Sequence, residues 1–339
     1  MKKKIYINLI TIIVVVALVL IVSLNYDFDS IMYHIVNMNI FWFIVAIIVM
    51  MISRLIIGIC SYMMVKINGE HVSIWKMIQI NYIIPFFHGI TPFSGGGQPM
   101  EIYYLHNEGI SKTKSTNIVL QNFILFQSAL IILSIIALLY NRLFNLFPSD
   151  SVMRSLVTFG FIINFLVLLF SYMLSFSKRV NKFILNKGIS FLSKIKIIKN
   201  VDTTREKLNN YINKFYTSAA FLKKQKGKVV MVLLLNVISL IVQYSVPYVV
   251  AIGMGVSNIS FLPIVVATTY VMMIGSFVPI PGGTGGIEYG FVYFMGYIID
   301  ETGLVTAIML IWRLISYYFS MVIGAITLIF YRKKEKECE

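Results

Sequence analysis

The stretch Thr91-Pro92-Phe93-Ser94-Gly95-Gly96-Gly97-Gln98-Pro99-Met100-Glu101 interrupts an apolar region of this chain with residues that end helices. It shares the spacing Pro-x-x-Gly-Gly-x-x-x-x-Glu with a second stretch, 187 residues further on, Pro279-Ile280-Pro281-Gly282-Gly283-Thr284-Gly285-Gly286-Ile287-Glu288. Proline and paired glycines break helices, and a carboxylate in hydrocarbon is costly unless protein or water surrounds it. The repetition therefore indicates an internal duplication built around a polar site.

The composition is that of an integral membrane protein. Of the 339 residues, 58% are hydrophobic and 13% are charged, which is outside the usual range of soluble domains. Apolar runs long enough to cross or enter a bilayer cover residues 5–24, 40–65, 74–90, 117–140, 156–176, 229–252, 261–278 and 304–331. Residues 5–24 predict a retained helix rather than a signal peptide, because no small-residue cleavage site follows them. Cys60 and Cys338 suggest neither a disulfide framework nor a zinc site.

The net charge of +15 is concentrated in one segment. Residues 177–228 contain 14 Lys and Arg residues and two acids, Asp202 and Glu206. By the positive-inside rule this segment is a cytoplasmic loop, so the charge gives no reason to expect a nucleic-acid partner. Part of the loop is either an amphipathic helix on anionic headgroups or a solvated chain that only sets topology.

Charges between the apolar runs predict how the chain threads the membrane. The expected loop at 25–39 contains Asp27 and Asp29 and no Lys or Arg, which places it outside. Cytoplasmic lysines, in contrast, flank the segment 74–110 on both sides. That segment must therefore leave and return on one side as a re-entrant hairpin, and 261–299 does so from the opposite face. The alternative is that 74–90 and 261–278 span fully. The first arm, residues 77–90, favours the hairpin, because it rises only about 21 Å against a core of roughly 30 Å.

We therefore expect a single all-α integral membrane domain over residues 1–339. It has about six spanning helices and two oppositely oriented re-entrant helical hairpins, an inverted repeat of the kind that binds substrate near the midplane. The hairpin at 74–110 belongs to the first half, the basic loop at 177–228 joins the halves, and the hairpin at 261–299 belongs to the second. The N- and C-termini are expected in the cytoplasm.

The glycine-rich turns predict a lipid-headgroup site. Glycine lets backbone approach a ligand closely, and a helix that begins after the turn directs its positive dipole end at the tip. The alternative is that these glycines only allow tight helix packing. The candidate lipid-binding residues of the two turns are Pro92, Gly95, Gly96, Gly97, Gln98, Pro279, Gly282, Gly283, Gly285 and Gly286.

Four charged residues complete the candidate site. Arg54 and Arg313 lie inside apolar runs, where arginine usually pairs with a carboxylate or lines a wet cavity, and Glu101 and Glu288 are the available partners. Two interpretations stay open. The groups are either structural ion pairs, or the arginines clamp a phosphate beside carboxylates that receive an amine.

The chain resembles the membrane domain of the lysylphosphatidylglycerol synthase/flippase family. The resemblance covers nearly the whole chain and rests on Ile90-Thr91-Pro92, Gly96-Gly97-Gln98-Pro99, Tyr103-Tyr104, Pro279 to Glu288 and Trp312-Arg313-Leu314-Ile315-Ser316-Tyr317-Tyr318. It implies that hairpin residues and Arg313 line a lipid path. Full-length members of that family add lysine to phosphatidylglycerol with a soluble transferase domain, and their membrane domain flips the product outward. This chain ends eight residues after Tyr331, so we expect it to lack the transferase domain.

The resulting prediction is translocation of a phospholipid, such as aminoacylated phosphatidylglycerol, across the bacterial plasma membrane, with altered resistance to cationic antimicrobial peptides as a corollary. The alternatives are a phosphatidylglycerol lysyltransferase, or a non-transporting membrane partner of a separate lipid synthase. We expect no cofactor. The sequence contains no phosphate-binding Gly-x-x-x-x-Gly-Lys-Ser/Thr loop for ATP and no ligand spacing suited to a metal.

Overall fold

The computed structural model describes residues 28–148, 152–176, 187 and 225–331, and these residues contain helices and no strands. Within them, five helical units are long and apolar enough to span a bilayer: α3 (Ile40–Ile67), α6 (Lys112–Phe144), α7 (Val152–Phe176), α10 with α11 (Lys226–Tyr244 and Val246–Gly253) and α14 with α15 (Thr302–Arg313 and Ser320–Phe330). The prediction of an all-α integral membrane protein is confirmed. The expected helix at 5–24, nearly all of the basic loop and the C-terminal residues 332–339 lie outside the described residues.

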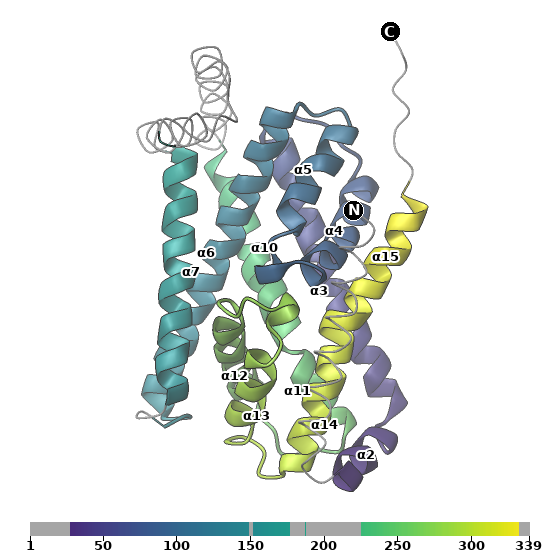
Figure 1. Cartoon of the computed structure of the whole chain (residues 1–339), viewed down its shortest axis with the longest axis vertical. Coiled ribbons are helices and arrows are strands. Elements are labelled where there is room, and N and C mark those ends of the chain that lie inside the picture. The colour runs from purple at the N-terminus through teal and green to yellow at the C-terminus, as the bar shows by residue number, and fades with distance from the viewer. Residues whose placement is uncertain (1–27, 149–151, 177–186, 188–224, 332–339) are drawn as a thin grey trace.

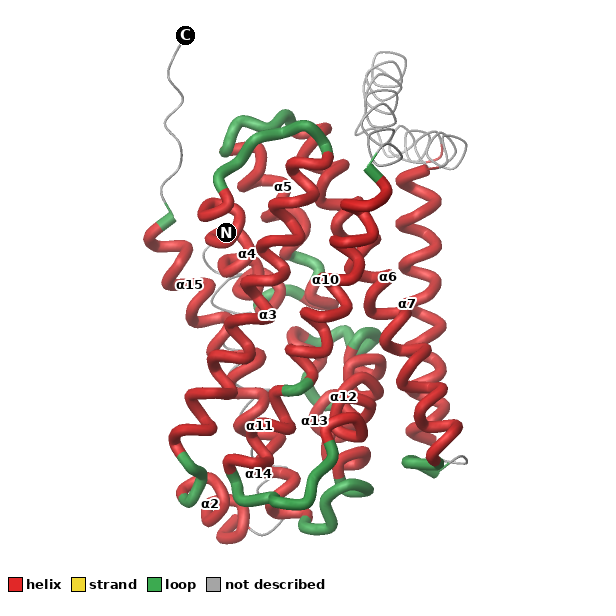
Figure 2. The backbone as a smooth tube through the Cα atoms, turned by 180° about the vertical axis from the view of Figure 1, so that it is seen from behind, coloured by secondary structure: helices red, strands yellow, loops and turns green. Residues whose placement is uncertain are grey.

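Two helical hairpins enter the bundle from opposite ends. In the first, the turn η1 (Pro92–Ser94) joins α4 (Ile74–Gly89) to α5 (Gly97–Asn107). In the second, η2 (Pro281–Gly283) joins α12 (Phe261–Gly275) to α13 (Gly286–Met295). Figures 1 and 2 show α4 and α5 toward one end of the bundle and α12 and α13 toward the other end. The turns η1 and η2 contact each other, so the predicted oppositely oriented hairpins are confirmed and their tips meet inside the bundle.

The two halves repeat the same order of elements. A long helix, a hairpin and a second long helix follow one another as α3, α4–α5 and α6, and again as α10–α11, α12–α13 and α14–α15. The first helical unit of each half has 28 residues. The helix α7 lies between the halves in the sequence and packs against α6 and α12.

The long helices of the second half are interrupted, whereas those of the first half are continuous. α10 ends at Tyr244 and α11 begins at Val246, with Pro247 in its first turn, where proline removes a helix hydrogen bond. A π-helical turn, η3 (Leu314–Phe319), separates α14 from α15. Such turns are rare and often occur at functional sites.

Each hairpin packs against helices of both halves of the chain: α4 lies against α3 and α15, and α12 lies against α6 and α7. In the first half, the buried core contains Met77 and Ile80 of α4 and Leu105 of α5. In the second half, Phe291 of α13 stacks on Trp312 of α14, with ring centroids 4.8 Å apart. Large apolar side chains also cover the outside of the long helices, as expected for surfaces that face lipid.

The structure corrects one expectation for the segment between the first two apolar runs. Residues 25–39 were expected to form a loop, but Phe28–Val36 is a helix, α2, which packs against α14. The segment is too short for its periodicity to be recognised, and Ile31 is its one buried residue. The His34 ring lies 2.6 Å from a Glu301 carboxylate oxygen, which joins the start of the described chain to the start of α14.

Candidate functional site

The first hairpin tip is a tightly bonded turn. The Thr91 hydroxyl donates to the Phe87 carbonyl at 2.7 Å and accepts the Gly96 amide at 2.9 Å. Phe93 and Ser94 have φ values of 53° and 52°, a conformation that side chains rarely adopt and that is found at strained functional turns. The tip backbone is therefore held in one shape before any ligand arrives.

The second tip depends on glycine. Gly282, Gly283 and Gly285 have φ values of 70°, 66° and 91°, which favour glycine over other residues. A Cβ atom on Gly282 would also lie 2.5 Å from the ring of Tyr317. The glycines of this turn are therefore required both by the backbone conformation and by a close side-chain contact.

Both tips are exposed although they meet inside the bundle. Phe93 is 62% exposed and Ile280 is 38% exposed, and the other exposed tip residues are Pro92, Ser94, Gly95, Pro279 and Gly285. Irregular backbone at membrane depth is stable only against protein or water. The structure therefore leaves parts of both tips uncovered by protein.

A buried ion pair stabilises the second tip. The Arg313 Nε atom lies 2.8 Å from a Glu288 carboxylate oxygen, and both side chains are less than a tenth exposed. The guanidinium also donates to the Gly282 carbonyl at 3.0 Å and lies 4.7 Å from the centre of the Tyr317 ring. The sequence-based expectation that a buried arginine pairs with a carboxylate is met at this position.

Tyr317 connects the two hairpins. Its hydroxyl donates to the Gly89 carbonyl, at the end of α4, at 2.9 Å. Its ring meanwhile contacts Gly282 in the other hairpin and Arg313 one turn earlier in its own helix. The sequence analysis did not single out Tyr317, although its position four residues after a buried arginine puts both on one helix face.

The N-termini of the two inner helices differ. At α13, the Glu288 carboxylate accepts the Gly285 amide at 2.7 Å and caps the helix. At α5 the corresponding amide, that of Gly96, donates to the Thr91 hydroxyl, and the first turn contains no acidic residue. The first backbone amides of a helix have no partner within the helix and carry the positive end of its dipole. The first tip therefore lacks the carboxylate that neutralises the helix start at the second tip.

Arg54 lies beside the first tip. Its Nε atom is buried and finds no hydrogen-bond partner among the described residues. Its side chain is within electrostatic range of Tyr82 and of the His88 ring. His88 in turn contacts the Ser94 carbonyl and lies against Gly97, where a Cβ atom would be 2.2 Å from the ring. Arg54 and His88 thus place two basic groups next to the start of α5.

Glu101 is buried but does not pair with Arg54, so the second expected ion pair does not form. Its carboxyl contacts the Ser61 hydroxyl of α3. That hydroxyl also contacts the side-chain amides of Asn81 and Asn122. Ser61 and Asn81 could not be singled out from the sequence, because isolated serine and asparagine residues in apolar helices give no pattern.

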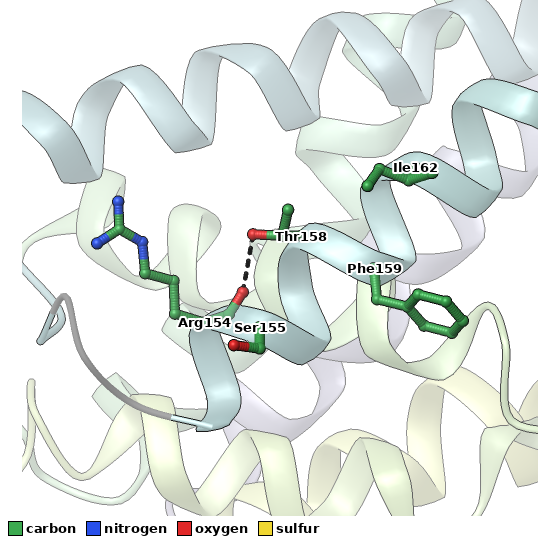
Figure 3. Close-up of a pocket in the computed structure, with 5 residues that line it drawn as sticks. All are labelled: Arg154, Ser155, Thr158, Phe159 and Ile162. Atoms are coloured by element: carbon green, nitrogen blue, oxygen red, sulfur yellow. Dashed lines mark hydrogen bonds between the residues drawn. The ribbon is translucent and has the colours of Figure 1, made fainter.

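A separate depression lies on the surface of α7. It has a volume of about 360 Å³ and is lined by Arg154, Ser155, Thr158, Phe159 and Ile162 (Figure 3). All five residues come from one helix, and the Thr158 hydroxyl bonds to the Arg154 carbonyl of the same helix at 2.9 Å. The depression contains none of the hairpin residues and does not belong to the candidate site.

Comparison with known proteins matches this architecture to one family. The family model described as "Lysylphosphatidylglycerol synthase TM region" matches residues 8–324. The chain is also similar to a UPF0104 membrane protein of Archaeoglobus fulgidus, with 22% identity over 266 residues that cover 76% of this chain and 77% of the relative. The family match spans both hairpins, the buried Arg313–Glu288 pair and nearly all of the spanning helices. The chain therefore belongs to the lysylphosphatidylglycerol synthase transmembrane-region family and is a multi-pass membrane protein.

Proposed function

We propose that this protein moves a phospholipid between the leaflets of a bilayer, with the headgroup passing the two hairpin tips and the acyl chains remaining in lipid. The observation that carries the proposal is the contact between two exposed, irregular tips that enter from opposite ends of the bundle. A headgroup crosses a bare bilayer slowly because its charges lose their water. Hydrated tips within the bundle lower that cost.

The first tip is the proposed phosphate site. The start of α5 carries no acidic residue, and the nearby Arg54 has a buried nitrogen that lacks an acceptor among the described residues. Amides at a helix start and a guanidinium are the groups that bind phosphate most readily. In the second tip, Arg313 and the start of α13 are already neutralised by Glu288.

The distribution of charge supports an orientation. Six lysines of the described residues gather at one end of the bundle, where Lys114 pairs with Glu70 and Gln225 bonds to the Ile67 carbonyl. The other end holds the acids Asp300 and Glu301 and two arginines, Arg142 and Arg154. By the positive-inside rule we assign the lysine end to the cytoplasm, in a bacterial plasma membrane, with both termini on that side.

The name of the family suggests the lipid. We propose aminoacylated phosphatidylglycerol as a substrate, since it carries both a phosphate for the first tip and an amine. The described groups fit such a headgroup, with the Arg54 guanidinium near the first tip and the carboxyl of Glu101 on α5. A separately encoded synthase would then supply the lipid.

Reconstitution into liposomes tests the proposal. Fluorescent phosphatidylglycerol, lysyl-phosphatidylglycerol and phosphatidylcholine are each placed in both leaflets, and an impermeant reductant reports how fast inner-leaflet label becomes accessible. We expect movement of lysyl-phosphatidylglycerol. Monodisperse protein that moves none of the lipids contradicts lipid transport, and lysyl transfer from charged tRNA by the same sample would favour a transferase instead.

Matched arginine variants connect the assay to the site. Removing a charged hydrogen-bonding group costs about 1.5–3 kcal/mol, so we expect Arg54→Gln to slow lipid movement by about 10- to 100-fold. Arg142→Gln removes an exposed arginine in the last turn of α6, away from the tips, and should leave the rate unchanged. Equal rates for the two variants would exclude Arg54 from the lipid path.

A further inference from the structure

Glu101 and Glu288 hold equivalent positions in the two halves but have different partners. Glu288 pairs with Arg313 at 2.8 Å. The residue that corresponds to Arg313 in the first half, 187 positions earlier, is Phe126. Glu101 consequently has no cation at the equivalent place, and its carboxyl instead contacts the Ser61 hydroxyl. Both halves thus contain the glutamate, but only Glu288 has an arginine partner among the described residues.

The lysines around Glu101 have other contacts. α5 packs against α4 and α6. Lys76 of α4 lies 3.8 Å from Glu108, and Lys114 of α6 pairs with Glu70. Lys112 begins α6 at an exposed position, and Lys66 of α3 lies over the ring of Tyr62.

The remaining titratable groups near α5 are also engaged elsewhere. The His88 ring contacts the Ser94 carbonyl, and the Tyr82 hydroxyl donates to the carbonyl of residue 51 at 2.9 Å. On α5 itself, the His106 ring lies 2.9 Å from the Ile110 carbonyl. Tyr104 packs against another tyrosine ring, and Tyr103 points outward. In the part of the chain that the structure describes, no Lys, Arg or His forms an ion pair with Glu101.

The hydrogen bonds at Ser61 indicate which form of Glu101 fits. The Asn81 amide nitrogen donates to the Met77 carbonyl at 2.9 Å, so its oxygen faces the Ser61 hydroxyl, 3.2 Å away. The Asn122 amide nitrogen donates to the same hydroxyl at 3.0 Å. A serine hydroxyl has one proton and two lone pairs. One lone pair accepts from Asn122, and Asn81 requires the proton.

A protonated Glu101 completes this network. Its carboxylic proton fills the second lone pair of Ser61, while the Ser61 proton goes to Asn81. An ionised Glu101 would instead compete with Asn81 for the single Ser61 proton and leave one buried acceptor unsatisfied. A buried carboxylate without a cation also carries the full cost of desolvation. The geometry therefore favours the neutral acid.

We propose that Glu101 is a proton-binding site and that loading and release of this proton is coupled to lipid movement. The inference rests on the proposed transport function and names its energy source. A proton from the water on one side forms the O–H bond of the carboxylic acid. That bond breaks when the carboxyl opens to the water on the other side, and no other bond changes. Glu288, which forms an ion pair with Arg313, does not carry the proton.

Infrared spectroscopy tests proton binding without any transport assay. In detergent at neutral pH we expect a carboxylic C=O band that is lost in Glu101→Gln and retained in Glu288→Gln and Glu70→Gln. Ser61→Ala should shift the band, because it removes the hydrogen-bond partner of the acid. Absence of the band from folded wild-type protein, or its persistence in Glu101→Gln, would overturn the proposal. If the Gln variant does not fold, the shift in Ser61→Ala assigns the band instead, and a band that Ser61→Ala leaves unchanged overturns the proposal.

A pH gradient across the liposomes tests coupling. For one proton per lipid, a gradient of one pH unit should shift the distribution of labelled lipid between leaflets by up to about tenfold. Glu101→Gln should remove the shift, and Glu70→Gln, at the exposed end of the bundle, should keep it. Lipid that moves with no response to the gradient refutes coupling. A Glu101 band in protein that moves no lipid under any condition instead refutes the transport function and leaves proton binding intact.

Discussion

The Tyr317 hydroxyl lies 2.9 Å from the Gly89 carbonyl oxygen, so a residue of the π-helical turn in the last spanning unit is bonded to the end of the first hairpin's outer helix. The same ring covers Gly282 in the second hairpin. One side chain thus sets the position of each tip relative to the other.

Loss of the Tyr317 hydroxyl should affect transport more than folding. In Tyr317→Phe the ring still covers Gly282 and Arg313, but the bond to Gly89 is gone. A single such bond contributes about 1 kcal/mol or less in membrane proteins, so we expect a small fall in Tm. The liposome assay should nevertheless show slower lipid movement. A wild-type rate in this variant would mean that the tips do not need this connection.

Substitution of tip glycines should separate required positions from tolerant ones. Gly282→Ala places a Cβ atom 2.5 Å from the Tyr317 ring at a φ of 70°, so we expect poor folding or lost activity. Gly95→Ala is the matched control, because its φ is −80° and the nearest atom would be 3.6 Å from the new Cβ. Thermal unfolding in detergent measures both. Equal stability of the two variants would contradict the close packing described for the second tip.

The Arg313–Glu288 pair should show strong coupling in a double-mutant cycle. Arg313→Ala leaves Glu288 buried without its cation, which typically costs about 3–5 kcal/mol. Replacing both residues, as Arg313→Met with Glu288→Gln, removes both charges and should recover most of that loss. Unfolding free energies of the single and double variants measure the coupling. Additive effects would show that the pair does not stabilise the tip.

Cysteine labelling should distinguish hydrated tips from lipid-facing surface. In a background with Cys60 and Cys338 replaced by alanine, Phe93→Cys and Ile136→Cys introduce thiols at positions that are 62% and 51% exposed. An impermeant, water-soluble maleimide should react with the cysteine at 93 in the membrane and leave that at 136 unmodified, because a thiol in hydrocarbon cannot meet the reagent. Equal modification of both sites after solubilisation is the control. Protection of position 93 in the membrane would contradict a hydrated tip.

Much of the architecture was predictable, because a spanning helix needs a long apolar run and a turn at membrane depth needs residues that break helices. Apolar runs give the spanning helices, and the matched Pro92 and Pro279 motifs give the hairpins. The helix α2 was missed because a nine-residue segment with a single buried side chain leaves no periodic signal. The π-helical turn after Arg313 was also missed, since no residue type encodes it and packing determines it.

The candidate site was predictable as a set of residues but not as a set of partners. The repeated motif makes Glu101 and Glu288 look equivalent, and nothing local shows that only Glu288 meets an arginine. That difference depends on Arg313 having no counterpart at Phe126, which becomes visible once the two halves are aligned through their helices. The Ser61 contact with Glu101 depends on how α4 and α6, which pack against both α3 and α5, position those two helices, and it cannot be read from spacing.

The interruptions at Ser245 and at Leu314–Phe319 both fall in the second half, while α3 and α6 of the first half run without a break. A continuous helix resists bending, whereas a break concentrates deformation at a few residues. We therefore expect the helices of the first half to stay rigid and those of the second half to bend during transport, although both halves have the same order of elements. Two halves with the same order of elements would then have different mechanical roles.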